Sequence, residues 1–499
     1  MKTNLKIILL VAFVMAIGSN VFGQNWFNKR YNSSYTELSA SVCTFENYSW
    51  VFGTRLTDTH SILYLIKIDQ LGNKIDSTII QHPYKHYFTG WAGFSKITSD
   101  SGMIMAGAVL DTSGYSDVLL IKFNSNGDTL WTKQYDIVPN ETAFDVIETS
   151  DKGFAIVGSS EEDTIAGTMV ARIIKTDSLG NFEWTQIYIE DNLALGTFII
   201  QNPDKGFCIG GATSYGNPPS VRYPYVIKTD SLGVLQWIHK YSSEFDTNVN
   251  ACVINTSDGN LAIASGYSPI NNWPSDFKGY LYVAKIDINN GDTIWTRKFG
   301  KAIEYGQILF SITELSDGSL VSAGYTFENG FQKQFAVLLK TSSNGDSLWL
   351  RYYTAENLPA DSSESYFFHV QETYDNGLIA CGWMYYQGSQ NFLAIKTDAN
   401  GCLDLSCVND VEELEEDDFR LSIYPNPAED DVSIDLPIMH NTGILQIYSL
   451  QGQLVKSASI TTGGTQSFSI ADMPNGIYNL VVYSSTNKLL GREKLVVVH

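Results

Sequence analysis

The fold is decided by the stretch AFDVIETSDKGFAIVGSS (residues 143–160) and its continuation ARIIKTDSLGNFEWTQIY (residues 171–188). It contains four short runs in which apolar and polar residues alternate. Asp/Gly turns follow the first and third runs, as tight hairpins require. Such alternation is typical of antiparallel β-strands, and the stretch lacks helical periodicity. It therefore predicts one four-stranded antiparallel sheet.

The same pattern recurs along the chain with a nearly constant period. Its third run carries a lysine each time, and these lysines are 55, 53, 53, 57, 55 and 56 residues apart. They define repeat units 1 to 7, whose lysines are Lys67, Lys122, Lys175, Lys228, Lys285, Lys340 and Lys396. Four strands per unit at this period fit the blades of a propeller. The sequence thus predicts an all-β fold dominated by a seven-bladed β-propeller with four antiparallel strands per blade.

The two ends of the repeat region complement each other. Unit 7 stops at Cys402 without a Trp-bearing fourth strand, whereas QNWFNKRY at residues 24–31 has no strands before it. Phe27 and Tyr31 have the spacing of Trp184 and Tyr188 in unit 3. We therefore predict that the N-terminal strand completes unit 7 and closes the ring, leaving no unpaired outer strand there.

The repeated aromatic residues have a structural explanation. One tryptophan near the start of each fourth strand is expected to pack between adjacent blades. These tryptophans are Trp131, Trp184, Trp237, Trp295 and Trp349. Unit 1 departs from the pattern, because Asp76 stands at the tryptophan position.

The flanking segments set the predicted domain boundaries. Residues 1–23 have two lysines, an apolar run and then small residues, as in a signal peptide. The propeller is predicted at 24–408, and an acid-rich linker at 409–419. Alternating strands over 420–499 indicate a small Ig-like β-sandwich. No later run is long and apolar enough for a membrane span.

Charge and cysteine content restrict the partners. The formal net charge is −22, which would repel a phosphate backbone, so nucleic acid is not expected as a partner. Cys43, Cys208, Cys252 and Cys381 lie in apolar strand-like runs and are expected to be buried. Cys402 and Cys407 are close together in a polar segment of an exported chain, where a local disulfide can form.

The C-terminal segment contains a specific set of motifs. They comprise Tyr424-Pro425-Asn426-Pro427, then Gly452, then Gly476-Ile477-Tyr478, and a terminal strand that starts at Lys494. In these motifs residues 420–499 resemble the type A C-terminal sorting domain of the type IX secretion system in Bacteroidetes. The resemblance implies secretion machinery and a sortase-like peptidase as partners of residues 420–499. It also implies release from the cell or attachment to its surface.

The sequence contains few signals of catalytic chemistry. The chain has no metalloprotease, phosphate-loop or nucleophile-elbow motif, and its histidines are scattered. Asp287, Gly291 and Trp295 have the spacing of a quinoprotein repeat, but the other units are one residue shorter. We expect no cofactor and no metal, and the sequence favours a protein without catalytic activity.

Sequence variation indicates where a ligand could bind. In a four-stranded meander, the first-to-second and third-to-fourth turns share one end of the ring, and here they repeat. The remaining connections share the other end, vary in sequence and contain aromatic residues suited to sugars or peptides. The binding candidates there are Trp91, Tyr215, Arg222, Tyr223, Trp273, Tyr385 and Tyr386.

Three classes of function follow. The first is a secreted or cell-surface propeller that binds an extracellular glycan, protein or matrix through the variable connections. The alternative is an extracellular hydrolase or lyase acting on polysaccharide, with two carboxylates near the central channel as acid and base. A quinone-dependent oxidoreductase is a third possibility.

Overall fold

A computed structural model divides the chain into two compact parts, residues 1–410 and 411–499. It describes residues 25–90, 92–112, 114–162, 169–189, 193–215, 221–241, 250–267, 278–304, 307–328, 333–355, 363–404, 422–436, 443–449, 454–460, 464–484 and 489–499. Within these ranges the regular secondary structure consists of β-strands. The predicted signal peptide at 1–23 and linker at 409–419 lie outside them.

Units 1 to 4 form strands in the predicted order. Unit 1 contains β2 (Thr36–Thr44), β3 (Tyr48–Leu56), β4 (Ser61–Asp69) and β5 (Lys74–Ile80). In unit 2 the first strand is divided into β6 (His86–Thr89) and β7 (Ser95–Ile97), which both pair with β8 (Met103–Leu110). The unit continues with β9 (Ser116–Phe123) and β10 (Thr129–Tyr135). Unit 3 contains β11 (Glu141–Glu148), β12 (Phe154–Glu161), β13 (Met169–Thr176) and β14 (Phe182–Tyr188). Unit 4 contains β15 (Leu193–Gln201), β16 (Phe207–Tyr215), β17 (Val221–Thr229) and β18 (Leu235–Lys240).

Units 5 to 7 continue this order. Unit 5 contains β19 (Cys252–Asn255), β20 (Leu261–Tyr267), β21 (Lys278–Ile286) and β22 (Thr293–Glu304). Unit 6 contains β23 (Ile308–Glu314), β24 (Leu320–Glu328), β25 (Lys333–Thr341) and β26 (Ser347–Tyr353). Unit 7 contains β27 (Ser363–Glu372), β28 (Leu378–Tyr386) and β29 (Ser389–Thr397). Single parallel bridges, between β13 and β15 and between β25 and β27, join units 3 and 4 and units 6 and 7.

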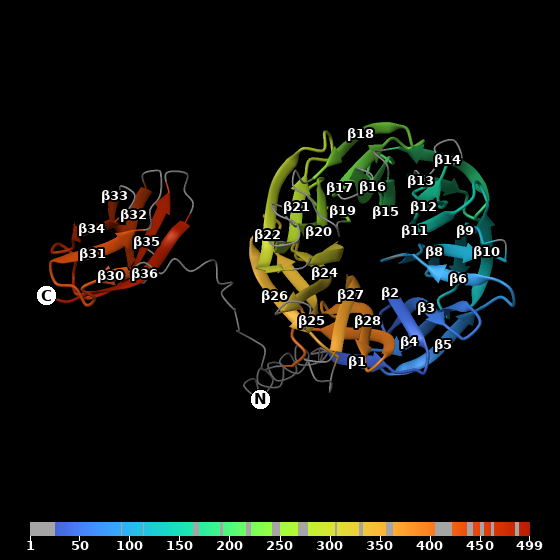
Figure 1. Cartoon of the computed structure of the whole chain (residues 1–499), viewed down its shortest axis with the longest axis horizontal. Helices are drawn as coiled ribbons and strands as arrows, with labels where there is room; N and C mark the ends of the chain where they lie inside the picture. Colours follow the sequence, from blue (N-terminus) through green and yellow to red (C-terminus); the bar gives the residue numbers. More distant parts are fainter. Residues whose placement is uncertain are drawn as a thin grey trace, which may run out of the picture. The chain divides into compact units, whose positions relative to one another are not determined.

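The sheets follow one another around a ring, the arrangement of a β-propeller (Figure 1). First strands such as β2, β11 and β15 lie toward its middle, and fourth strands such as β10 and β18 lie outside. The N-terminal strand β1 (Phe27–Tyr31) pairs with β29, with Phe27 opposite Lys396. The pairing predicted to complete unit 7 is therefore present.

Neighbouring units are joined by a repeated contact at the third-to-fourth turn. In unit 3 the Asp177 carboxylate accepts hydrogen bonds from the backbone N–H groups of Leu179 (2.9 Å) and Asn181 (2.8 Å), which closes the turn. Gly180 in this turn has φ +74°, and Trp131 of unit 2 packs against it. A side chain at Gly180 would collide with that ring and would strain the backbone.

A tyrosine at the end of the fourth strand completes this contact. Its hydroxyl donates to the carbonyl of the turn glycine in the next unit, as in Tyr135–Gly180 (2.8 Å), Tyr188–Gly233 (2.7 Å), Tyr241–Gly291 (2.9 Å) and Tyr353–Gly401 (2.7 Å). Tyr31 of β1 donates to Gly72 of unit 1 at 3.0 Å, and Phe27 packs on the same glycine. The last and first units thus meet through the contact that joins sequence neighbours.

Unit 1 replaces its missing tryptophan from a different strand. Asp76 occupies the tryptophan position, but Trp50 of β3 is fully buried and packs against the turn glycine of unit 2, Gly127. The Trp50 indole N–H also donates to the Ser125 carbonyl at 3.2 Å. The inter-unit contact is therefore kept although the repeat is degenerate.

The repeated lysine pairs with an aspartate of the first-to-second turn. The pairs are Lys122–Asp100, Lys175–Asp151, Lys228–Asp204, Lys285–Asp258, Lys340–Asp317 and Lys396–Asp375. Each of these lysine side chains is buried, which requires a charged partner. Lys67 of unit 1 instead lies over Tyr48, with 3.9 Å between its Nζ and the ring centroid.

Residues 422–498 contain two antiparallel sheets. One consists of β30 (Ser422–Tyr424), β31 (Asp431–Leu436) and β34 (Gly464–Ser469), and the other of β32 (Gly443–Ser449), β33 (Leu454–Ile460), β35 (Gly476–Ser484) and β36 (Leu489–Val497). Val432 and Ile434 of the first sheet share an apolar core with Ile447, Leu480 and Leu495 of the second.

Candidate functional site

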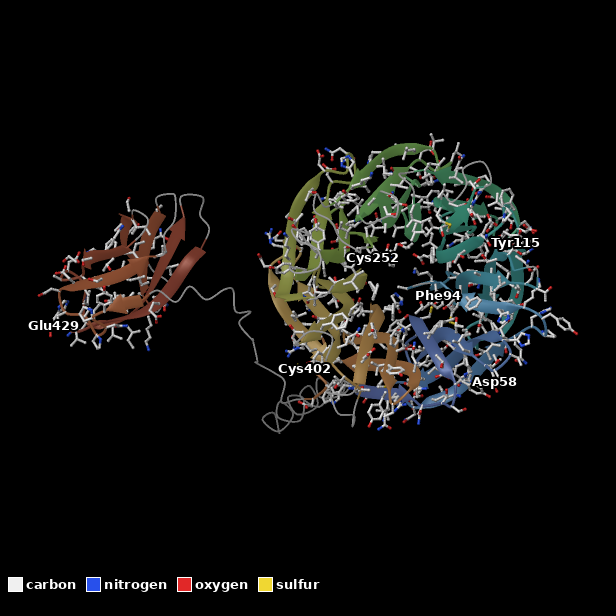
Figure 2. The ribbon with its side chains drawn as sticks, viewed as in Figure 1. Asp58, Phe94, Tyr115, Cys252, Cys402 and Glu429 are labelled. Carbon is white, nitrogen blue, oxygen red and sulfur yellow. The ribbon has the colours of Figure 1, made fainter. Side chains whose placement is uncertain are left out.

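One position of the repeat places side chains close to the ring axis. Phe94 and Cys252, which occupy it in units 2 and 5, lie near the middle of the ring (Figure 2). In the other units this position follows a β-bulge in the first strand and holds Ser41, Asp145, Phe198, Ser311 and His369. A serine, a histidine and an aspartate around one axis invite comparison with a catalytic site.

These polar side chains instead join neighbouring first strands. Each accepts a hydrogen bond from a backbone N–H of the next unit, in the pairs His369–Val42 (3.1 Å), Ser41–Ser95 (3.2 Å), Asp145–Ile199 (3.1 Å) and Ser311–Val370 (3.3 Å). The first strand is a sheet edge, so its N–H groups need such acceptors. Burial, together with a smaller contribution from nearby Lys96, lowers the pKa of His369 to about 3. The imidazole is therefore neutral at physiological pH.

Two carboxylic acids of β11 have pKa values above their usual range. Burial raises the pKa of Asp145, although Lys96 Nζ lies 2.8 Å away. Burial also raises the pKa of Glu141 to about 7, although Arg172 Nε lies 3.3 Å away. Four residues along a strand separate them by about 13 Å. Paired carboxyl groups of glycosidases are roughly 5 to 10 Å apart, so these two do not form such a pair.

The predicted binding residues of unit 7 lie at the end of β28. Tyr385 is 41% exposed. Tyr386 is half-buried, and the Arg30 guanidinium carbon of β1 lies 5.8 Å from its ring centroid. Two aromatic side chains therefore border the loop between β28 and β29.

Another group of predicted residues lies in unit 4. Tyr223 of β17 is half-buried, with Lys240 Nζ 5.8 Å from its ring centroid. Tyr215 and Arg222 are on the paired strands β16 and β17, next to the connection between these two strands. The structure thus divides the described candidates between units 4 and 7. Trp91 and Trp273 lie outside the described residues.

An aromatic cluster between units 6 and 7 was not predicted from the sequence. Ring centroids are 4.7 Å apart for Phe310–Phe368, 4.9 Å for Tyr325–Tyr366 and 3.9 Å for Tyr366–Trp383. Tyr325, Tyr366 and Trp383 are half-buried, and Trp383 is two residues before Tyr385 on β28. These residues lie on strands, whereas the predicted binding residues were assigned to the connections between strands. The sequence signal for this cluster is an aromatic residue at the β-bulge of the first strand in units 6 and 7, Phe310 in ILFSI and Phe368 in YFFHV.

The cysteines separate into two groups. Cys43, Cys208, Cys252 and Cys381 are buried free thiols. Cys402 is buried and disulfide-bonded, whereas its predicted partner Cys407 lies outside the described residues. Among the described residues, no group of three or more His, Cys, Asp or Glu side chains could hold a metal ion.

The motif residues of the C-terminal part come together at one edge. The Asn426 side chain donates to the Lys494 carbonyl at 2.7 Å and accepts from the Val496 N–H at 2.8 Å. The segment Tyr424–Pro427 and Lys494 are exposed, so the Tyr-Pro-Asn-Pro motif and the terminal strand present one surface. Tyr478, two residues after Gly476, donates to the Pro474 carbonyl at 2.8 Å. Gly452 lies outside the described residues.

Residues 422–498 match the family model of the secretion system C-terminal sorting domain. The tail is a sorting domain. This sorting domain implies interaction with type IX secretion machinery and export to the cell surface or the medium. Within the described ranges the structure has no helix with the length and apolar character to cross a membrane.

Several solved structures are similar to the chain. One is the β-propeller domain of the Trilobed protease from Pyrococcus furiosus, with 12% identity over 73% of this chain and 95% of that chain and a TM-score of 0.42. Another is an acylaminoacyl peptidase from Pyrococcus horikoshii, with 12% identity over 81% of this chain and 58% of that chain and a TM-score of 0.39. At these values the likeness carries no information on activity. No curated protein matches the chain.

Proposed function

We propose that the chain is an exported binding protein without catalytic activity. Its ligand is an extracellular glycan, protein or matrix polymer, held at the end of the ring that carries the variable connections. The observation that carries this proposal is the aromatic cluster of Tyr325, Tyr366 and Trp383 beside the exposed Tyr385. Half-buried aromatic rings held on strands offer rigid apolar surface with little loss of side-chain entropy.

The proposed scaffold is a seven-bladed propeller with an Ig-like sorting domain. One four-stranded group per repeat unit supports the blade number, and so does the Tyr31–Gly72 contact between unit 7 and unit 1. The proposed boundaries are 1–23 for the signal peptide, 24–408 for the propeller, 409–419 for the linker and 420–499 for the sorting domain. An experimental structure that placed an additional sheet between unit 7 and unit 1 of the ring would contradict the blade number.

Export is proposed to remove both ends of the chain. A signal peptidase would cleave after Gly23, and a sortase-like peptidase would remove residues 420–499. Mass spectrometry of the protein from the medium or the cell surface tests this. The expected product begins at Gln24 and lacks the sorting domain. An exported chain that retains Tyr424–Val498 would contradict the proposed processing.

Binding is tested with the purified full chain on a glycan array and on matrix proteins. Trp383→Ala and Tyr385→Ala are expected to weaken any interaction by at least about tenfold, since each removes aromatic contact area. Tyr115→Ala is the matched control, because Tyr115 is 53% exposed beside the equivalent loop of unit 2. Ligands whose binding is unchanged in both test variants would contradict the proposed surface.

A polysaccharide hydrolase or lyase is the second candidate function. The raised pKa of Glu141 favours it, since a pKa of about 7 suits a general acid. Glu141 is fully buried beside Arg172, however, so substrate does not reach it in this conformation. Turnover of a polysaccharide by the full chain, abolished in Glu141→Gln, would establish this alternative in place of the binding protein.

A further inference from the structure

Unit 5 departs from the repeat in its third-to-fourth turn. In unit 4 the Gly233 N–H donates to the carbonyl of Asp230, three residues earlier. In unit 5 the Gly291 N–H donates to the carbonyl of Asp287, four residues earlier, because this turn holds one residue more.

Unit 4 departs from the repeat at the residue facing that turn. The turn glycine of unit 3, Gly180, lies against Lys133 of unit 2, and the turn glycine of unit 4, Gly233, lies against Gln186 of unit 3. His239 takes this place against Gly291, where an added Cβ would lie 2.8 Å from its ring. A short rigid ring and a longer turn therefore meet at one contact.

A pocket of about 330 Å³ lies where these two departures meet. The residues that line it are His239, Lys240, Tyr241, Tyr282, Gly291, Asp292 and Thr293. It lies between the fourth strand of unit 4 and the turn of unit 5, away from the aromatic cluster of units 6 and 7.

The pocket combines buried aromatic residues with exposed polar ones. Tyr241 and Tyr282 are each 6% exposed, and the Tyr241 hydroxyl is fixed by its hydrogen bond to the Gly291 carbonyl. The His239 ring stacks with Tyr241, with 6.3 Å between centroids. Asp292 and Thr293 are exposed beside these rings, so polar groups border the aromatic residues. The Lys240 side chain lies on the opposite face of β18, where its Nζ is 5.8 Å from the Tyr223 ring centroid.

We propose that this pocket binds a neutral saccharide of one or two rings, as a site separate from the loop-end surface. A sugar ring presents an apolar C–H face to aromatic side chains and hydroxyls that both donate and accept. The Thr293 hydroxyl can donate to such hydroxyls, and the Asp292 carboxylate can accept from them. A carboxylate on the rim repels an anionic sugar, which favours a neutral one. The volume is at the lower end of small-ligand sites, roughly 300 to 1,000 Å³.

Calorimetry and ligand-detected NMR on the full chain test this proposal. The probes are the methyl glycosides of glucose, galactose, mannose and N-acetylglucosamine, with galacturonate as the charged comparison. At least one neutral glycoside is expected to bind. Asp292→Asn is expected to weaken it by about tenfold or more, as loss of a hydrogen bond to a charged group does. Deletion of Asn290, which restores the turn length of unit 4, is expected to abolish binding.

Asp128→Asn is the matched control, because Asp128 follows the turn glycine of unit 2 as Asp292 follows Gly291. Binding that persists without Asn290 but is lost in Trp383→Ala would overturn the pocket and leave the loop-end proposal standing. Tighter binding of galacturonate than of every neutral glycoside, or no binding of any probe, would overturn the proposal. If the deletion variant fails to fold, Asp292→Asn and His239→Gln decide the question.

Discussion

The two ends of the propeller ring are built in different ways. At the turn end, which carries the first-to-second and third-to-fourth turns, the contacts recur from unit to unit: Asp-closed turns, Tyr–Gly hydrogen bonds and Lys–Asp pairs. At the loop end, which carries the other connections, aromatic residues gather differently from unit to unit, as in the cluster of Tyr325, Tyr366 and Trp383 in units 6 and 7. The repeated contacts hold neighbouring sheets together. The difference teaches that stability should be sought at the turn end and ligand binding at departures from the repeat.

The largest expected effect comes from breaking the contact between units 7 and 1. Phe27→Ala combined with Tyr31→Phe should lower the free energy of unfolding by about 3–5 kcal/mol, because a buried ring and a hydrogen bond are both lost. Denaturant titration measures this. Ser34→Ala, in the exposed segment after β1, should change it little. A small effect of the double variant would show that ring closure does not depend on β1.

Trp50 provides the next test, since it substitutes for a repeat residue. Trp50→Leu should cost about 2–4 kcal/mol, because the ring is fully buried against Gly127. Tyr115→Leu at the loop end is the comparison, and its 53% exposed side chain should be nearly neutral. Equal effects of the two substitutions would remove the distinction between the ends.

A single hydrogen bond of the turn end is tested by Tyr188→Phe. The hydroxyl donates to the Gly233 carbonyl at 2.7 Å, and its removal should cost about 1 kcal/mol. The same experiment on Tyr135 and Tyr353 should give similar values, because their contacts repeat this geometry. Widely different values would mean that the repeated contacts are not energetically equivalent.

Acid should weaken the turn end selectively. Hydrogen bonds from Thr149, Lys175 and Gly153 lower the pKa of Asp151 to about 2, outweighing its partial burial. A depressed carboxyl pKa adds stability above the unfolded-state pKa, near 4, and this stability is lost as pH falls toward 2. Asp151→Asn should therefore flatten the fall in unfolding free energy between pH 4 and 2. The change should stay below about 1 kcal/mol, since the carboxylate is largely exposed.

The smallest effect on stability is expected at the proposed binding surface. Tyr385→Ala should change the unfolding free energy by no more than about 0.5 kcal/mol, because the side chain is 41% exposed. The same substitution should weaken ligand binding. A large loss of stability would instead make Tyr385 a packing residue and would sharpen the case for Trp383 as the contact residue.

Much of the turn end was predictable because it is encoded locally. Alternating runs, Asp/Gly turns and the fourth-strand aromatics recur with a fixed period, so each unit predicts the others. The pairing of β1 with β29 followed from the same register, since Phe27 and Tyr31 match Trp184 and Tyr188. The compensation by Trp50 was not predictable, because it comes from a position of the second strand that carries no tryptophan in the other units.

The sequence by itself determined the repeat, its strand order, the completion of unit 7 and the presence of a sorting tail, because each depends on residues close together or on one register. Only the tertiary structure decided which side chains meet across neighbouring units. It gave His369 and Asp145 structural partners, joined Tyr325 to Trp383, and brought His239 beside the longer turn of unit 5. Such contacts depend on the packing of whole sheets around an axis, and residues about 50 positions apart carry no local signal of it.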